Sequence, residues 1–108
     1  MGHDITTLFE NLPGADLMIA GLDDVAAGRE TVAGELVKIG SPRLRESGVN
    51  VEVSPEAALD ADRQLYRLLS ASHGLAAHSQ YNALVRQLVS FERALAQRIA
   101  RERRLSPG

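Results

Sequence analysis

The sequence predicts an all-α fold: a small bundle of four to five helices, in which two long C-terminal helices are broken near Gly74. Apolar side chains recur every three or four positions along most of the chain, which is the spacing of one helix face. Ala, Leu, Arg and Gln, all of which favour helices, dominate the second half. Val49, Val51 and Val53 alternate as in a strand, but no other stretch alternates to pair with them.

Length and composition indicate one helical domain over residues 1–108, with mobile ends at 1–4 and 105–108. Aromatic residues make up 4% of the chain and Trp is absent, so we expect an aliphatic core. The absence of Cys excludes disulfides, thiolate metal ligands and Cys nucleophiles. No apolar run approaches the ~18 residues of a membrane span, and the N-terminus lacks the pattern of a signal peptide. We therefore expect a cytoplasmic protein with no membrane partner.

The N-terminal half is expected to hold three helices and a short fourth one. A brief helix begins near Ile5, and Pro13 suits the first turn of the next helix, which Gly28 can end. A third helix follows, and Gly40 is expected to stop it. Residues 41–48 then read as one or two further helical turns, with a Ser cap, a Pro at the first position and a closing Gly.

The C-terminal half is expected to hold the two long helices. The valines of residues 49–53 form an extended connector that touches the core. Ser54 is placed to cap the next helix and Pro55 to open it. The buried face of this helix comprises Ala58, Ala61, Leu65 and Leu68. The buried face of the last helix comprises Tyr81, Leu84, Leu88, Phe91, Leu95 and Ile99.

A break between residues 72 and 80 is predicted from the phase of these two faces. Sixteen positions separate Leu65 from Tyr81, which rotates the face by roughly 160° at about 100° per residue. One straight helix would therefore point its two apolar faces in opposite directions. Gly74 can adopt a positive φ after the first helix, with Leu75 packing back onto it.

Arg67, His73 and His78 gather at this joint and are the candidate catalytic residues. A joint between helices accounts for the two histidines without any reactive role, since a His near a helix C-terminus interacts favourably with the helix dipole. The histidines are five positions apart rather than the four that present two ligands on one helical face. We therefore predict no metal site and no cofactor.

The stretch RLLSASH contains Arg67 followed by five residues and then His73. It resembles the R-x(4–6)-H motif of the HEPN family of helical ribonucleases. The resemblance implies that Arg67 holds a phosphate and that His73 moves a proton, in a dimer that pairs two copies of the motif. The sequence departs from the family at Leu68, where a polar residue usually follows the Arg.

Residues 31–48 suggest another nucleic-acid hypothesis, because a helix, a glycine turn and a second helix follow one another as in a helix-turn-helix. The acidic half that contains this stretch argues against DNA binding, since acidic fields repel the phosphate backbone. Residues 1–62 hold 12 acidic and 4 basic residues, whereas residues 63–108 hold 2 acidic and 8 basic residues.

The most direct interpretation of this asymmetry is that acidic and basic parts attract each other, within one chain or between two. We expect a non-catalytic assembly or protein-interaction module that forms a homodimer; another protein partner is possible. The interface candidates are Leu88, Phe91, Leu95 and Ile99, because a long C-terminal helix would leave part of its apolar face uncovered. The alternative is a nucleic-acid protein, either a DNA binder through residues 31–48 or a HEPN-like ribonuclease.

Overall fold

The computed structural model describes residues 5–105. The predicted all-α class is confirmed, since these residues form helices and no strand. The expectation of mobile ends concerns residues outside this range, apart from Leu105, which ends the last helix. In the described part, no helix has the length and hydropathy needed to cross a membrane. The elements are α1 (Ile5–Phe9), α2 (Ala15–Ala27), α3 (Val32–Glu46), α4 (Pro55–His73), a short 3-10 turn η1 (Gly74–Ala76) and α5 (Ala77–Leu105).

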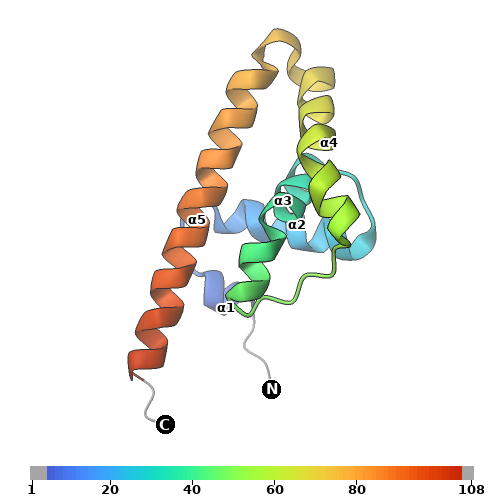
Figure 1. The fold of residues 1–108 in the computed structure, drawn as a ribbon. Helices are drawn as coiled ribbons and strands as arrows, with labels where there is room; N and C mark the ends of the chain where they lie inside the picture. Colours follow the sequence, from blue (N-terminus) through green and yellow to red (C-terminus); the bar gives the residue numbers. More distant parts are fainter. Residues whose placement is uncertain (1–4, 106–108) are drawn as a thin grey trace.

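The two long helices form a hairpin that extends past the rest of the fold (Figure 1). α4 and α5 run in opposite directions and meet at η1, which is the tip of the hairpin. α3 packs against both of them away from the tip, and α2 packs on α3. The described part is therefore elongated, with principal extents of 51 × 24 × 19 Å.

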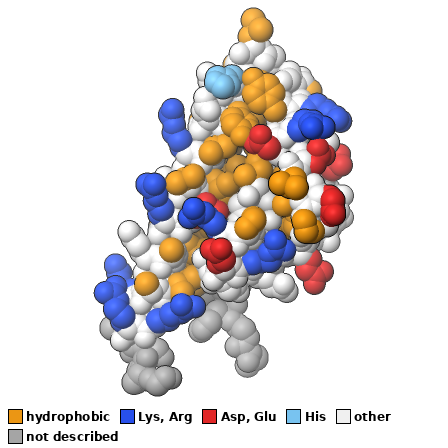
Figure 2. Space-filling model, in the orientation of Figure 1, with side chains coloured by type: hydrophobic (Ala, Val, Ile, Leu, Met, Phe, Trp, Pro, Cys, Tyr) orange, Lys and Arg blue, Asp and Glu red, His pale blue; other side chains and the backbone are white. Residues whose placement is uncertain are grey.

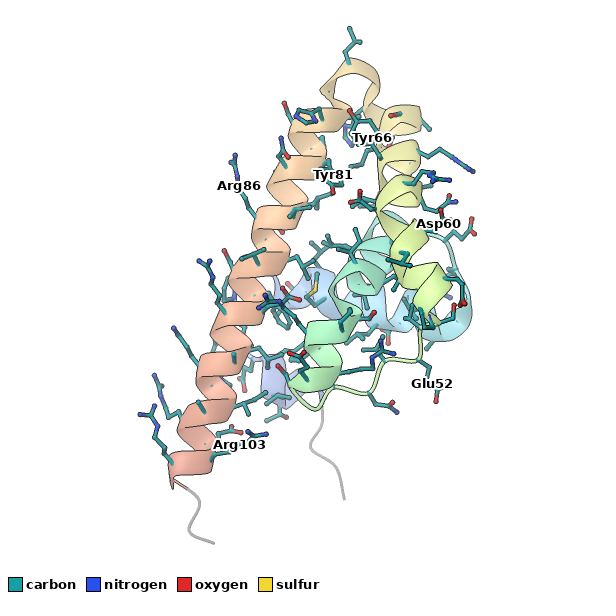
Figure 3. The ribbon with its side chains drawn as sticks, in the orientation of Figure 1. Glu52, Asp60, Tyr66, Tyr81, Arg86 and Arg103 are labelled. Carbon is teal, nitrogen blue, oxygen red and sulfur yellow. The ribbon has the colours of Figure 1, made fainter. Side chains whose placement is uncertain are left out.

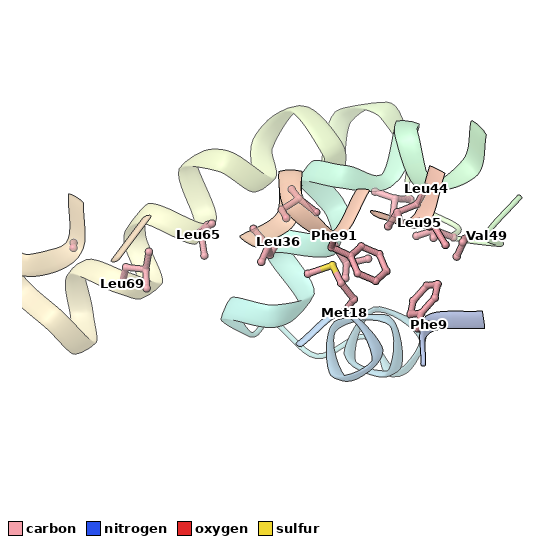
Figure 4. Packing of buried hydrophobic residues seen from close by; sticks show 14 residues of the cluster. Phe9, Met18, Leu36, Leu44, Val49, Leu65, Leu69, Phe91 and Leu95 are labelled. Carbon is pink, nitrogen blue, oxygen red and sulfur yellow. The ribbon is translucent and has the colours of Figure 1, made fainter. Parts of the chain in front are cut away.

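A buried aliphatic cluster joins all five α-helices, with two phenylalanines at one end (Figure 4). Phe9 of α1 and Phe91 of α5 stack edge to face, with ring centroids 4.7 Å apart. Met18 of α2 and Leu36 of α3 are fully buried beside them. The buried positions of α4 are Ala61, Leu65 and Leu69, close to the predicted face.

Side chains of the turn between α2 and α3 fix the angle of that turn. Thr31 caps α3 by accepting a hydrogen bond from the Gly34 amide at 2.9 Å. Its hydroxyl donates to Asp24 of α2, which also accepts from Arg29. The Thr31 hydroxyl, followed by Arg29, lowers the pKa of Asp24, so the carboxylate stays charged in this turn.

The prediction that Gly40 ends the third helix is wrong. α3 continues through Gly40, Ser41 and Pro42 to Glu46, so residues 41–48 are not a separate helix. Pro42 lacks the N–H that would bond to the Lys38 carbonyl one turn earlier. The Ser41 hydroxyl donates to that carbonyl instead, at 2.8 Å, and so replaces the missing bond. The helix-turn-helix geometry expected for residues 31–48 is therefore absent.

Gly40 has a packing role within α3. A Cβ at this position would lie 2.8 Å from Leu88 Cδ1 and 3.0 Å from Glu92 Oε2 of α5. Glycine therefore lets α3 approach α5 closely. Burial raises the pKa of Glu92 at this contact, while the charge of Arg43 opposes the rise.

The connector and the position of the break between the two long helices follow the sequence predictions. Val49, Val51 and Val53 are buried although they form no strand, and the Ser54 side chain accepts a hydrogen bond from the Ala57 amide. The predicted break is present, since α4 ends at His73, and Gly74 has a φ of 55°. The expectation that Leu75 packs back onto α4 is wrong, because its side chain is fully exposed at the tip.

The replacement of a backbone donor by Ser41 can be tested with a double-mutant cycle. We expect Ser41→Ala to lower the free energy of unfolding by about 1–3 kcal/mol, because it leaves the Lys38 carbonyl without a partner. In a Pro42→Ala background the same change should cost less, because the new backbone N–H at position 42 can then bond to the Lys38 carbonyl. Urea unfolding of the four proteins measures both costs. An equal loss of unfolding free energy on Ser41→Ala in the two backgrounds would show that the Ser41 hydroxyl does not replace the missing backbone N–H.

Candidate functional site on the helical hairpin

The residues predicted as an oligomer interface lie in the core of one chain. Leu88, Phe91 and Leu95 are each at most 3% exposed, and Ile99 is partly buried against the core. An interface role would require that one chain leave these side chains uncovered. A single chain already covers Leu88, Phe91 and Leu95.

The large apolar side chains that remain exposed in the described part all lie on the hairpin. We call them the hairpin apolar surface, which comprises Leu59, Tyr66, Leu75 and Val89. Leu59 is 85% exposed and Leu75 is fully exposed. Figure 2 shows apolar side chains from the tip of the hairpin downward, with charged groups on both sides.

Leu59 and Tyr66 form the α4 part of this surface. They are seven positions apart, which places them within about 20° of each other around the helix. This side of α4 differs from the buried side, which carries Ala61, Leu65 and Leu69. The seven-residue spacing of Leu59 and Tyr66 is visible in the sequence. It is weaker than the spacing of the buried residues on the same helix, which determined the predicted face.

Aromatic and polar side chains connect α4 with α5 beside this surface (Figure 3). The ring of Tyr66 lies 5.8 Å from the ring of Tyr81 and 6.4 Å from that of His78. The Tyr81 hydroxyl donates to the Asp62 carboxylate. This hydrogen bond, with burial and the charge of Asp62, raises the pKa of Tyr81 to about 12. The cluster therefore places Tyr66 against two rings of α5 and keeps Tyr81 protonated at neutral pH.

The structure does not gather the three candidate catalytic residues into one site. Arg67 and His73 lie on one continuous helix, six positions apart, so their side chains leave the axis about 120° apart. Arg67 and His73 are both exposed. His78 belongs to α5, and its ring lies near that of Tyr66 on α4. In the part of the chain that the structure describes, no group of three or more potential ligands could hold a metal ion.

The outer face of α5 is basic. Its exposed arginines lie away from the buried stripe, and blue side chains follow the edge of the molecule in Figure 2. Arg98 is different, because it donates to the backbone carbonyls of Leu8 and Glu10. The salt bridges among the described residues are Arg29–Asp24, Lys38–Glu35 and Arg63–Asp60, none of which involves α5. The exposed arginines are Arg86, Arg93, Arg101, Arg103 and Arg104.

The Tyr81–Asp62 hydrogen bond predicts a pH dependence. The pKa of Tyr81 is about 12 in the folded state against an ordinary value of 10.0. The hydrogen bond therefore contributes fully to the free energy of unfolding below pH 10.0, and this contribution is lost as the pH rises through about 12. In a Tyr66→Phe protein, ultraviolet titration should show Tyr81 ionising near pH 12. Adding Asp62→Asn should bring this pKa back toward 10. A normal titration of Tyr81 with Asp62 intact would contradict the hydrogen bond.

Comparisons with known proteins assign no family. No protein-family model matches the chain, and neither a curated protein nor a solved structure matches it. The function of the chain must therefore be inferred from its own side chains.

Proposed function

We propose that this protein is a non-catalytic assembly module that forms a homodimer through the hairpin apolar surface. The observation that carries the proposal is the exposure of Leu59 and Tyr66 on one side of α4. Covering a large apolar side chain stabilises an association by about 1.5–3 kcal/mol, before the costs of ordering. Leu75 at the tip and Val89 on α5 extend the surface beyond one helix.

Self-association is favoured because this surface can pair with itself. In a two-fold, antiparallel pairing of α4 centred between residues 62 and 63, Leu59 of one protomer lies opposite the partner's Tyr66. The same pairing brings Asp60 near the partner's Arg67 at two symmetric positions. Such pairs of opposite charge add specificity more than affinity.

A test of this dimer can avoid the core. Leu59 is 85% exposed, so Leu59→Asp should leave the fold intact, with a stability change within about 0.5 kcal/mol. We expect light scattering to give twice the chain mass of 11.6 kDa for the wild type at ~100 μM, and 11.6 kDa for Leu59→Asp. Gln97→Asp, on the outer face of α5, is the matched control and should remain dimeric.

The charge pairs provide a second arm of this experiment. Asp60→Arg alone and Arg67→Asp alone should each weaken the dimer, whereas the two changes together should restore it, because opposite charges face each other again. A monomeric wild type, or a Leu59→Asp protein that stays dimeric, would contradict the proposal.

A second candidate function is nucleic-acid binding, favoured by the exposed arginines of α5. Arg86 and Arg104 are 18 positions apart, so the basic face extends about 27 Å along the helix. No aromatic side chain on that face is placed to stack a base, and phosphates would be the main contact. For these reasons we place this function second.

The second candidate predicts a particular salt dependence. Fluorescence anisotropy with a labelled 20-nucleotide single strand should show an affinity that falls steeply with salt. Arg93→Ala and Arg101→Ala should each reduce the slope of log K against log salt by roughly 1. Gln97→Ala, between them on the same face, should not change the slope. Absence of binding at ~50 mM salt would exclude this function.

A further inference from the structure

A groove on another part of the fold has features that the assembly proposal does not use. It lies between α2 and the connector of residues 49–53 and has a volume of about 440 Å³. Leu22, Val25 and Ala26 of α2 line one side, and Val51 lines the other. Ligand-binding clefts have volumes of about 300–1,000 Å³, so the groove is large enough for a short segment of chain.

The connector offers unused backbone hydrogen-bonding groups along this groove. Val49, Val51 and Val53 are buried while Asn50 and Glu52 are exposed, the alternation of an extended chain. In the described part, the backbone N–H and C=O groups of residues 50–52 form no hydrogen bond. The flanking bonds, from the Val49 amide to Leu44 and from Arg45 to the Val53 carbonyl, lie outside this stretch. These free groups resemble the edge of a sheet.

The charged residues that line the groove indicate which charge a bound chain segment would carry. Asp23 and Glu52 line it, and neither belongs to a salt bridge among the described residues. Arg29 pairs with Asp24 and is not among the residues that line the groove. A positively charged occupant therefore complements these two carboxylates.

We infer that this groove binds an extended, basic segment of a partner protein by strand addition. The segment lies alongside residues 50–52 and exchanges backbone hydrogen bonds with them, as an added strand does at a sheet edge. Its apolar side chains pack on Leu22, Val25 and Ala26, and its Lys or Arg side chains reach Asp23 and Glu52. The groove is distinct from the hairpin apolar surface, so this site is independent of dimerisation.

The probe is the peptide acetyl-Lys-Val-Arg-Val-Lys-Val-amide, titrated into the isotope-labelled full chain. We expect the amide signals of residues 22–26 and 50–52 to shift. Hydrogen exchange should slow either at Val51 or at Asn50 and Glu52, because successive residues of an extended chain direct their N–H groups to opposite edges. Two N-methylated forms of the peptide, each blocked along one edge, separate strand addition from charge attraction. One form should bind and the other should not, because an added strand uses only one of its edges.

Two neighbouring alanines provide matched variants. Both alanines are exposed in the last turn of α2, but Ala26 lines the groove and Ala27 does not. Ala26→Tyr should weaken peptide binding by at least about tenfold and Ala27→Tyr should not, with both proteins equally folded. A peptide with Glu in place of Lys and Arg should also bind at least about tenfold more weakly.

Three outcomes would overturn the inference. The first is no binding of the basic peptide up to ~1 mM. The second is equal binding of both N-methylated forms, which would mean that charge alone attracts the peptide. The third is the same shifts on concentrating the protein without peptide, which would make a second copy of the chain the occupant.

Discussion

The structure depends on the close approach of α3 to its neighbours on two sides. A Cβ at Gly21 would overlap the Ala33 carbonyl oxygen and lie 2.5 Å from Val37 Cγ2, so only glycine lets α2 rest on α3. Gly40 allows the same closeness toward Leu88 of α5. Both glycines reduce helix propensity by roughly 1 kcal/mol each, and the packing that they permit offsets this cost. A larger side chain at either glycine would move α3 away from its neighbour, and the apolar residues of Figure 4 would then no longer pack against α3.

The central position of α3 also determines which surfaces remain open. Because α3 fills the space between α4 and α5 away from the tip, the upper hairpin has only its own two helices to cover its side chains (Figure 1). Tyr66 and Leu75 are left exposed there, whereas Leu59 is exposed near the start of α4. The chain returning from α3 to α4 passes beside α2 as an extended segment, and the groove forms at that passage. Two candidate binding surfaces thus follow from one packing arrangement, and α5 presents its arginines on a third side.

Periodicity was sufficient to predict the helices, the break at Gly74 and the buried valines of the connector, because these features depend on local spacing. It does not indicate what covers an apolar face, so it suggests Leu88, Phe91 and Leu95 as interface candidates, whereas in the structure they are buried in the core of one chain. The helix through Gly40 depends on a Ser41 hydroxyl and on a neighbouring helix, neither of which a glycine signal reveals. The groove joins residues 22–26 to residues 50–52, and no local pattern indicates that these segments meet.

The hydrogen bonds of Arg98 affect the order in which the helices unfold. Its guanidinium holds the carbonyls of Leu8 and Glu10, which are 90 and 88 positions away in the sequence. α1 has five residues, too few to persist as an isolated helix, so it depends on its contacts with the rest of the fold, among them these bonds, the Phe9–Phe91 contact and the packing of Leu8 on the core. Releasing α1 breaks few contacts with the remaining helices, whereas releasing α3 breaks contacts with three of them. We therefore expect α1 to open at a lower free energy than the other helices, which would let solvent reach Phe91 before the domain as a whole unfolds.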